Sequence, residues 1–129
     1  MVVVDTHAAL WLTEEPELLS GEARKALTEA RREGRIAIAG VTLRELAAQI
    51  VRGRIRVSTP TLNYLQFVES VFRVIPIDAR IAHRAFEFGP KYPKDPADRV
   101  IGATAVIHGA RLVTKDEYIR ASGEVDCIW

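Results

Sequence analysis

The sequence predicts an α/β fold of three layers, in which helices cover both faces of a central parallel sheet of four or five strands. Short runs of β-branched and small apolar residues alternate with longer segments that carry apolar residues at helical spacing. Favoured N-cap residues, prolines and glycines separate these segments. Because 129 residues suffice for one hydrophobic core, we expect a single domain that spans residues 1–129.

The N-terminal part of the chain predicts two strands and two helices. Residues 2–4 are valines, which favour a buried strand, and the polar Asp5 follows directly. A short apolar helix is expected over 7–12. Serine is a favoured N-cap, so a longer helix is expected over 20–33, before a glycine. The apolar run 36–39 predicts the second strand.

The middle of the chain predicts two helices and a third strand. Apolar residues at helical spacing extend from Thr42 to a stop near Gly53, and Thr42 with Glu45 matches the pattern of a capping box. A further helix is expected to start near Pro60, with the proline at its first position. The apolar run 74–77 predicts the third strand.

The C-terminal part predicts two more helices and two more strands. An aspartate is expected to cap a helix over 78–88. The stretch 89–94 contains glycine, prolines and lysines, which predicts an exposed loop. A helix over 95–108 follows, with an aspartate as its cap and a proline in its first turn. The fourth strand is predicted over 112–114, and a short edge strand over 125–129.

Four acidic residues fall where a predicted strand ends or a predicted helix begins: Asp5, Glu45, Asp98 and Asp116. In an open parallel sheet the carboxyl ends of the strands share one edge, and ligands bind there. We therefore expect the four carboxylates to converge. Four anions brought together repel one another unless a cation neutralises them. An all-oxygen ligand set suits Mg²⁺ or Mn²⁺ rather than zinc, so the sequence points to a divalent metal site.

Each of these acids also has a structural explanation. Glu45 and Asp98 stand three residues after a potential capping side chain, so both can satisfy helix N-terminal amides. Asp5 and Asp116 can serve in caps or turns. Asp95, which precedes a proline, is best explained as a cap. The metal-site hypothesis therefore depends on the four acids occurring together.

Further residues near the acids are candidates for supporting roles. The hydroxyls of Thr6 and Thr114 can hydrogen-bond the neighbouring carboxylates and hold their rotamers, or make simple turn hydrogen bonds. His7 can face either the cleft or the packing of the first helix. Arg99 and Lys115 each adjoin one of the acids and can bind a flanking phosphate or point to solvent.

Composition and charge exclude several classes of protein. No apolar run approaches the ~18 residues of a membrane span, and the N-terminus lacks the features of a signal peptide. The lone Cys127 cannot form an internal disulfide, so we expect a cytoplasmic protein. Of the 17 acidic residues, 13 remain when the four are set aside, against 18 basic ones, a net charge of +5. This excess suits a phosphate backbone, although solvated helix faces also explain it.

Four segments carry the acids: Val3-Val4-Asp5-Thr6-His7, Thr42-Leu43-Arg44-Glu45-Leu46, Asp95-Pro96-Ala97-Asp98-Arg99 and Leu112-Val113-Thr114-Lys115-Asp116. In their order and spacing they resemble the motifs of PIN-domain ribonucleases. The resemblance is strongest to the VapC toxins of bacterial toxin–antitoxin pairs, and it extends over nearly the whole chain.

This resemblance implies a Rossmann-like α/β/α PIN domain and a metal-dependent endoribonuclease that uses one or two Mg²⁺ or Mn²⁺ ions. It also implies a homodimer, and inhibition by a small VapB-like antitoxin. The family's acidic residues fall on Asp5, Glu45, Asp98 and Asp116. Thr114 stands at the position of a hydroxyl residue often found two places before the last acid. Thr42, Arg44 and Pro93 differ from residues that are common in the family at those positions.

On this hypothesis, Asp5, Glu45 and Asp98 hold the main ion, directly or through water, and Asp116 supports a second ion with Asp98 or Asp5. Two other classes of protein fit parts of the pattern. A phosphoacceptor receiver domain is also a small parallel α/β module, but its acceptor aspartate would follow the third strand, where Asp78 is better explained as a cap. A non-catalytic RNA-binding or antitoxin-sequestering module of the same fold is the other alternative, and the presence of all four acids argues against it.

Overall fold

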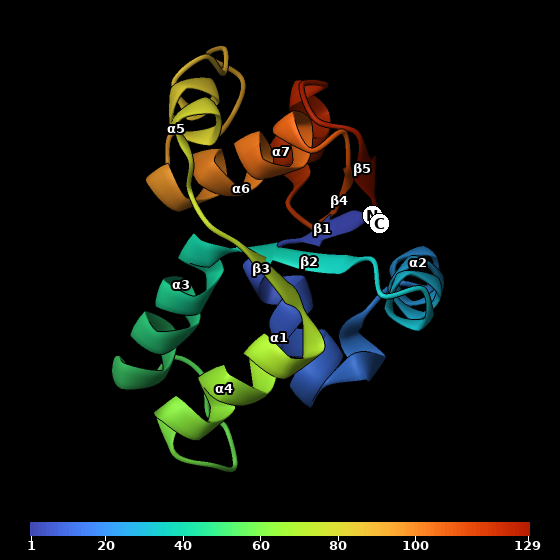
Figure 1. Ribbon diagram of the computed structural model, residues 1–129, viewed down its shortest axis with the longest axis vertical. Coiled ribbons are helices and arrows are strands. Elements are labelled where there is room, and N and C mark those ends of the chain that lie inside the picture. The colour runs from blue at the N-terminus through green and yellow to red at the C-terminus, as the bar shows by residue number, and fades with distance from the viewer.

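Five parallel strands form the central sheet in a computed structural model that describes all 129 residues (Figure 1). They are β1 (Val2–Val4), β2 (Ile36–Ala39), β3 (Arg73–Ile75), β4 (Arg111–Val113) and β5 (Cys127–Ile128). Their order in the sheet is β3-β2-β1-β4-β5, so β1 is the middle strand. The predicted parallel sheet of four or five strands is confirmed.

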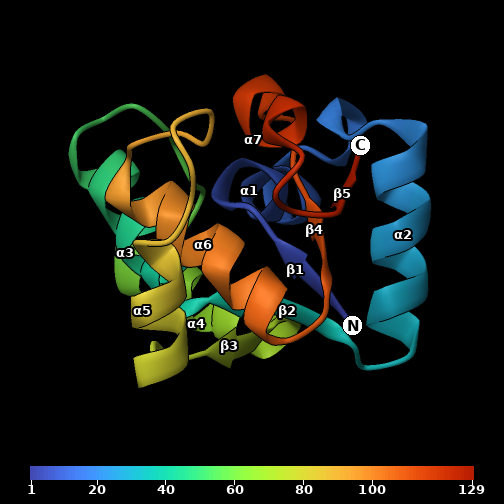
Figure 2. The ribbon, with the colours of Figure 1, turned by 90° about the horizontal axis from the view of Figure 1, so that it is seen from above.

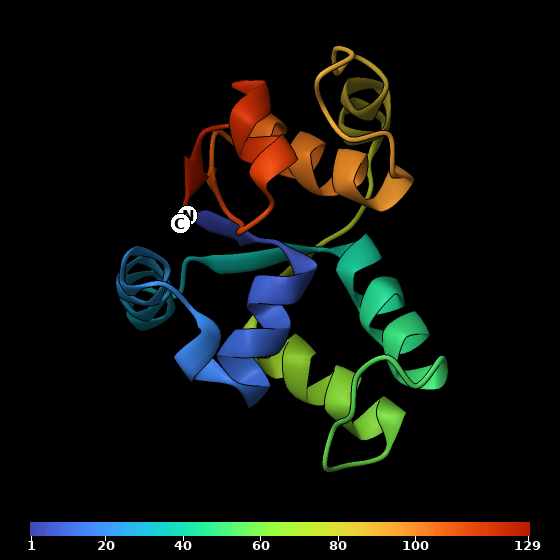
Figure 3. The same ribbon diagram turned by 180° about the vertical axis from the view of Figure 1, so that it is seen from behind.

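Helices cover both faces of the sheet, as the alternation of elements predicts. They are α1 (Thr6–Glu14), the 3-10 turn η1 (Pro16–Leu18), α2 (Gly21–Arg32), α3 (Gly40–Val51), α4 (Thr61–Val71), α5 (Ala79–Ala85), α6 (Pro96–Ile107) and α7 (Glu117–Ser122). One layer contains α5, α6 and α7, and the other contains α1 to α4 (Figure 1). In the second layer α2 and α3 lie at opposite ends, with α1 between them (Figure 3). The three-layer α/β/α fold is therefore confirmed.

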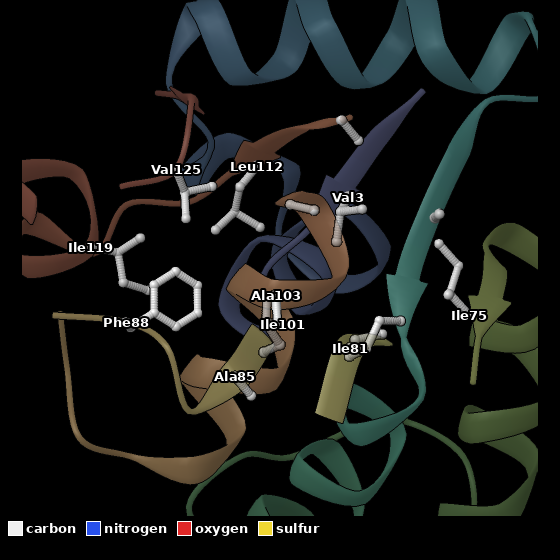
Figure 4. Close-up of a cluster of buried hydrophobic side chains, with 14 of the residues drawn as sticks. Val3, Ile75, Ile81, Ala85, Phe88, Ile101, Ala103, Leu112, Ile119 and Val125 are labelled. Atoms are coloured by element: carbon white, nitrogen blue, oxygen red, sulfur yellow. The ribbon is translucent and has the colours of Figure 1, made fainter. Parts of the chain in front are cut away.

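Each layer of helices packs on the sheet through its own hydrophobic core, because side chains alternate between the two faces along a strand. Val3 and Leu112 belong to the core beneath α5, α6 and α7, whereas the next residues in sequence, Val4 and Val113, belong to the core on the opposite face. Figure 4 shows the first core, where Val3 and Leu112 gather with Ile101 of α6. The sheet is thus buried on both faces and open only at its edges.

The order of the strands reverses beside β1. The chain adds β2 and β3 on one side of β1 and then crosses to add β4 and β5 on the other. β1 and β4 run alongside each other (Figure 2), and Val4 pairs with Val113 at their carboxyl ends. Since ligands of open parallel sheets bind at such a reversal, a site is expected just beyond these two residues.

Helix α3 begins two residues earlier than the sequence predicts, and its start corrects the capping-box interpretation. It follows β2 without a loop, with Ala39 as its N-cap and no side-chain hydrogen bond at that end. Thr42 therefore lies inside the first turn, fully buried, and accepts a hydrogen bond from the Thr6 hydroxyl at 3.4 Å. Glu45 lies in the second turn, so the alternative explanation of Glu45 as a capping residue is wrong.

Two other elements end earlier than predicted. Helix α5 stops at Ala85, because Phe88 turns into the core and stacks on Tyr92 with 3.9 Å between ring centroids. Strand β3 ends at Ile75, before Pro76, which has no N–H to donate to the sheet.

The short elements α7 and η1 were not predicted, because each is too short to show a helical repeat of apolar residues. Pro60 is the N-cap of α4 and not its first residue. The predicted caps Ser20, Asp78 and Asp95 are confirmed, since each side chain accepts a backbone N–H of its helix. None of the helices combines the length and the apolar character that a membrane span requires.

Candidate functional site: an acidic cleft at the carboxyl edge of the sheet

Asp5 is the most enclosed of the four acids, and its two carboxylate oxygens have different partners. It follows β1 directly and is 5% exposed. Its Oδ1 accepts a hydrogen bond from the Thr6 N–H at 2.7 Å, and its Oδ2 accepts one from the Thr114 hydroxyl at 2.6 Å. Burial outweighs these bonds and raises the pKa of the Asp5 carboxyl above its ordinary value. The Asp5 carboxylate is therefore held in place by hydrogen bonds but makes no ion pair.

The Thr114 hydroxyl also connects Asp5 to Asp116. Thr114 lies just past β4, fully buried, and its hydroxyl accepts a hydrogen bond from the Asp116 N–H at 3.1 Å while it donates to Asp5. The Asp116 Oδ1 accepts the N–H groups of Tyr118 and Ile119, both at 2.9 Å, so Asp116 is also the N-cap of α7. The Asp116 Oδ2 has no hydrogen-bond partner and remains free for a ligand.

Glu45 and Asp98 reach the same edge of the sheet from two helices. Glu45 lies on α3, and Asp98 lies in the first turn of α6. Together with Asp5 they line a cavity of about 70 Å³, whose walls also include Leu10 and Gln49. A single water molecule needs roughly 15 Å³ by this kind of measure. The cavity can therefore hold a small polar group among three carboxylates.

The N-terminus of α6 fixes the backbone of Asp98. The Asp95 Oδ1 accepts hydrogen bonds from the N–H groups of Ala97 at 2.8 Å and of Asp98 at 3.2 Å, as expected for a cap. The buried Tyr92 hydroxyl donates to the Asp98 carbonyl oxygen at 2.7 Å. Tyr92 fits there because Gly102, one turn further along α6, lacks the Cβ that would collide with the Tyr92 hydroxyl.

The carboxyl of Asp98 accepts no hydrogen bond and responds to the charges of the other acids. Burial is the main cause that raises its pKa from the ordinary 3.8 to about 7. The charges that raise it further belong to Asp5, Asp95, Asp116 and Glu45. The four predicted acids therefore share one electrostatic environment, although they come from separate segments of the chain.

The four carboxylates are nevertheless spread along the edge. No three acidic, histidine or cysteine side chains are close enough together to coordinate one ion. Asp5, Glu45 and Asp98 line one cavity, and Asp116 lines the next. The four acids thus lie along the same edge of the sheet, as predicted, but they do not surround a single point as a closed set of ligands. Mutual repulsion between the carboxylates favours this wider spacing. The donors are all oxygens. Burial and, to a lesser extent, the neighbouring anions raise the pKa of the Asp98 carboxyl, and a hard divalent cation would stabilise the ionised carboxylates against both, so the set fits Mg²⁺ or Mn²⁺.

A second hollow of about 400 Å³ opens on the other side of Asp5. Asp5 and His7 line both cavities. His7 is exposed on α1, so of the two orientations left open by the sequence it takes the one toward the cleft. Trp11 also lines the hollow, with 6.0 Å between its ring centroid and that of His7. Trp11 was not predicted as a site residue, although its spacing of four residues from His7 on the same helix indicates that the two side chains share one face.

The two other polar candidates near Asp5 differ from expectation in their contacts. The Thr6 hydroxyl contacts Thr42 and no carboxylate, and it is the Thr6 N–H that bonds Asp5. Lys115 is exposed, and its Nζ lies 5.5 Å from the centroid of the Trp11 ring. Lys115 is therefore at the rim of the second hollow, where its ammonium can reach an anion.

Arg99 and Cys127 are both engaged in packing. The Arg99 guanidinium donates to the carbonyl oxygen of Pro93 at 3.0 Å, and to those of Ala85 and Phe88 at 3.4 Å. These bonds tie the loop before α6 to the helix and account for the position of Arg99 without an RNA phosphate. Burial raises the pKa of the Cys127 thiol to about 11, so the thiol is protonated near neutral pH.

The fold and the cleft together define an α/β/α domain with a cluster of acids at the reversal point of a parallel sheet. The PIN domain family model matches residues 2–124. The chain belongs to the PIN-domain family, as the resemblance of its four motifs predicted.

Relatives and solved structures agree with this placement. The chain is 38% identical over 120 residues to Ribonuclease VapC22 from Mycobacterium tuberculosis (strain ATCC 25618 / H37Rv), an alignment that covers 93% of this chain and 90% of that protein. A similar fold occurs in VapBC2 from Rickettsia felis bound to a promoter DNA fragment, with a TM-score of 0.73 at 16% identity over 98% of this chain and 97% of that one. Another occurs in a toxin–antitoxin complex from Klebsiella pneumoniae, with a TM-score of 0.61 at 22% identity over 90% of this chain and 87% of that one. At these identities the two structures show similarity of fold alone.

Proposed function

We propose that this protein is a Mg²⁺- or Mn²⁺-dependent endoribonuclease that hydrolyses RNA phosphodiester bonds and acts as the toxin of a type II toxin–antitoxin pair, with residues 1–129 as its single domain. The observation that carries the proposal is the shared edge of the four acids, where the pKa of Asp98 is raised to about 7. The 38% identity to a relative named as a ribonuclease supports the activity.

The metal would be held by the acids at this edge. Asp5, Glu45 and Asp98 would hold the main ion, directly or through water, and Asp116 would support a second ion with Asp5 or Asp98. Such ions, when bound, lower the pKa of water and offset the negative charge that develops on the phosphoryl group.

The chain's own residues prepare this site. The Thr114 hydroxyl orients Asp5 and fixes the backbone of Asp116, whose Oδ2 stays free. Tyr92 positions the first turn of α6 and with it Asp98. A carboxyl with a pKa of about 7 is partly protonated near neutral pH, so Asp98 releases its proton when a cation neutralises its neighbours.

The proposed macromolecular partners are an RNA substrate, a VapB-like antitoxin and a second copy of the chain. The antitoxin partner is supported by the toxin–antitoxin complex of similar fold. We place the protein's action in the cytoplasm, where a lone cysteine such as Cys127 stays reduced.

The alternative proposal is a non-catalytic RNA-binding or antitoxin-sequestering module of the same fold. The observation that favours it is the spread of the acids, since no three of them are close enough to coordinate one ion. A module of this kind would bind RNA or antitoxin without binding Mn²⁺.

RNA cleavage by the purified protein tests the proposal. Activity should be absent in excess EDTA, should return with added Mn²⁺ or Mg²⁺, and should be lost in Asp98→Asn. The matched control is Asp126→Asn, which removes an exposed carboxylate that precedes β5, at the opposite edge of the sheet, and should remain active. Cleavage that persists in excess EDTA or in Asp98→Asn would overturn the proposal.

A further inference from the structure

The hollow between α1 and the segment after β4 shares Asp5 and Asp116 with the proposed metal site, but Trp11 and Lys115, which also line it, have no role there. Its volume of about 400 Å³ lies within the range of roughly 300–1,000 Å³ that is typical of small-molecule sites. It is lined by Asp5, His7, Trp11, Lys115, Asp116 and Glu117. Because Asp5 and His7 also line the smaller acidic cavity, a group in this hollow lies directly beside the proposed site of cleavage.

Trp11 supplies the flat apolar surface of the hollow. Its ring is part-buried, and it contacts Trp129 with 5.8 Å between centroids and 54° between planes. The contact with His7 is also tilted, at 47°, so neither neighbour stacks on a face of the Trp11 ring. The group found over the ring is the exposed Lys115 ammonium. A cation over an aromatic ring at an exposed position is held only weakly, so a planar ligand can displace it.

The charges around the hollow favour a neutral planar ligand over an anion. Asp5, Asp116 and Glu117 line it, and in the metal-free protein their carboxylates repel a phosphate from its interior. An RNA base is planar and uncharged, and each of the four bases can stack on an aromatic side chain. Lys115 at the rim is the cation that can meet the phosphate attached to such a base.

On the basis of the proposed ribonuclease function, we propose that Trp11 stacks on an unpaired base of the RNA, in a nucleotide next to the cleaved phosphodiester, and that Lys115 contacts a phosphate of the same strand. A base held in this way cannot be paired in a helix. The stacking subsite therefore needs an unpaired nucleotide directly beside the cleaved bond.

Binding of a short single-stranded RNA to Asp98→Asn protein tests the proposal without cleavage of the ligand. In this background Trp11→Ala should weaken binding by about 5- to 150-fold, equivalent to about 1–3 kcal/mol, and Trp11→Phe should retain most of the affinity. The matched control is Phe67→Ala, which removes an exposed aromatic ring on α4 outside both cavities and should leave binding unchanged.

An RNA that lacks one base provides the same test without a change to Trp11, so the result does not depend on how Trp11→Ala folds. Removal of the base beside the cleaved bond should cost the same fold in affinity, and this loss should not add to that of Trp11→Ala. The chain has 2 tryptophans, so Trp129→Phe leaves Trp11 as the only indole. Its fluorescence should be quenched by the intact RNA and not by the RNA that lacks this base.

Three outcomes would overturn or redirect the inference in distinguishable ways. Equal affinity for intact RNA and for RNA lacking a base at every position, with wild-type protein still cleaving RNA, overturns the stacking subsite and leaves the nuclease proposal standing. A wild-type protein that binds but does not cleave RNA in Mn²⁺ overturns the nuclease proposal and with it the basis of this inference. A Trp11→Ala variant that loses antitoxin binding but keeps RNA binding assigns the hollow to the partner protein and overturns the assignment to RNA.

Discussion

Replacing Asp98 with asparagine should stabilise the metal-free protein while it abolishes RNA cleavage. The pKa of Asp98 in the folded protein, about 7, lies above the ordinary 3.8, so the folded state binds the proton more tightly than the unfolded chain does. The contribution of Asp98 to the free energy of unfolding of the wild-type protein therefore falls as the pH rises from about 4 to about 7, because the ionised carboxylate is disfavoured in the cleft. Asp98→Asn removes this unfavourable ionisation.

The magnitude of the effect follows from the pKa of Asp98. A rise of the Asp98 pKa from 3.8 to about 7 on folding corresponds to a loss of at most about 4 kcal/mol in the free energy of unfolding once the carboxyl is ionised, since each pKa unit is worth about 1.4 kcal/mol. Because the side chain is partly exposed and solvent screens its charge, we expect the variant to be more stable by about 1–2 kcal/mol at pH 8 and by less than about 0.5 kcal/mol at pH 4. The carboxyl accepts no hydrogen bond that the amide would lose.

Urea unfolding in EDTA at pH 4, 6 and 8 measures the difference in the free energy of unfolding between the two proteins. Asp126→Asn is the control, since it removes one partner of an exposed ion pair with Arg111 and should change stability by less than about 1 kcal/mol. The reasoning is refuted if Asp98→Asn is less stable than wild type at pH 8, or if its advantage is the same at every pH.

Two further substitutions test the contacts that position the acids. Thr114→Val should lower RNA cleavage by about 10- to 100-fold and the free energy of unfolding by about 1–3 kcal/mol, because Asp5 loses its hydroxyl donor. Thr114→Ser keeps the hydroxyl and should retain most of the activity and of the stability. Full activity of the valine variant in a cleavage assay would contradict this role. Gly102→Ala should destabilise the protein by about 1–3 kcal/mol in urea unfolding, because the added methyl group collides with Tyr92. An unchanged midpoint would show that Tyr92 does not need the space that Gly102 leaves. Its control is Gly21→Ala, where no atom lies within 4 Å and stability should not fall.

The order of the elements could be predicted from sequence because strands and capped helices carry local signals. The valine run at 2–4 and the caps Ser20 and Asp95 are of this kind, and the structure contains all three. The start of α3 could not be predicted, because Ala39 offers no side-chain cap. Thr42, three residues later, matches a capping pattern that the buried first turn does not use. The burial of Thr42 depends on tertiary packing, which local sequence patterns do not predict.

The edge that holds the four acids could also be predicted, but their separations could not. Asp5 and Asp116 follow neighbouring strands, so the sheet alone brings them together, through Thr114. The directions of the Glu45 and Asp98 side chains depend on how α3 and α6 pack against the sheet, which no spacing in the sequence encodes. The support of Asp98 by Tyr92 was missed for the same reason, since it depends on the fit of Tyr92 over α6.

Calorimetric titration of metal-free protein with Mn²⁺ tests most directly whether the four acids at this edge bind divalent cations. The wild-type protein should bind one or two ions and, near pH 6.5, should release up to one proton, because the pKa of Asp98, about 7, must fall when the cation binds. Four folded variants should each bind Mn²⁺ at least about tenfold more weakly: Asp5→Asn, Glu45→Gln, Asp98→Asn and Asp116→Asn. Failure of the wild-type protein to bind Mn²⁺, or equal affinity in all five proteins, would contradict the account.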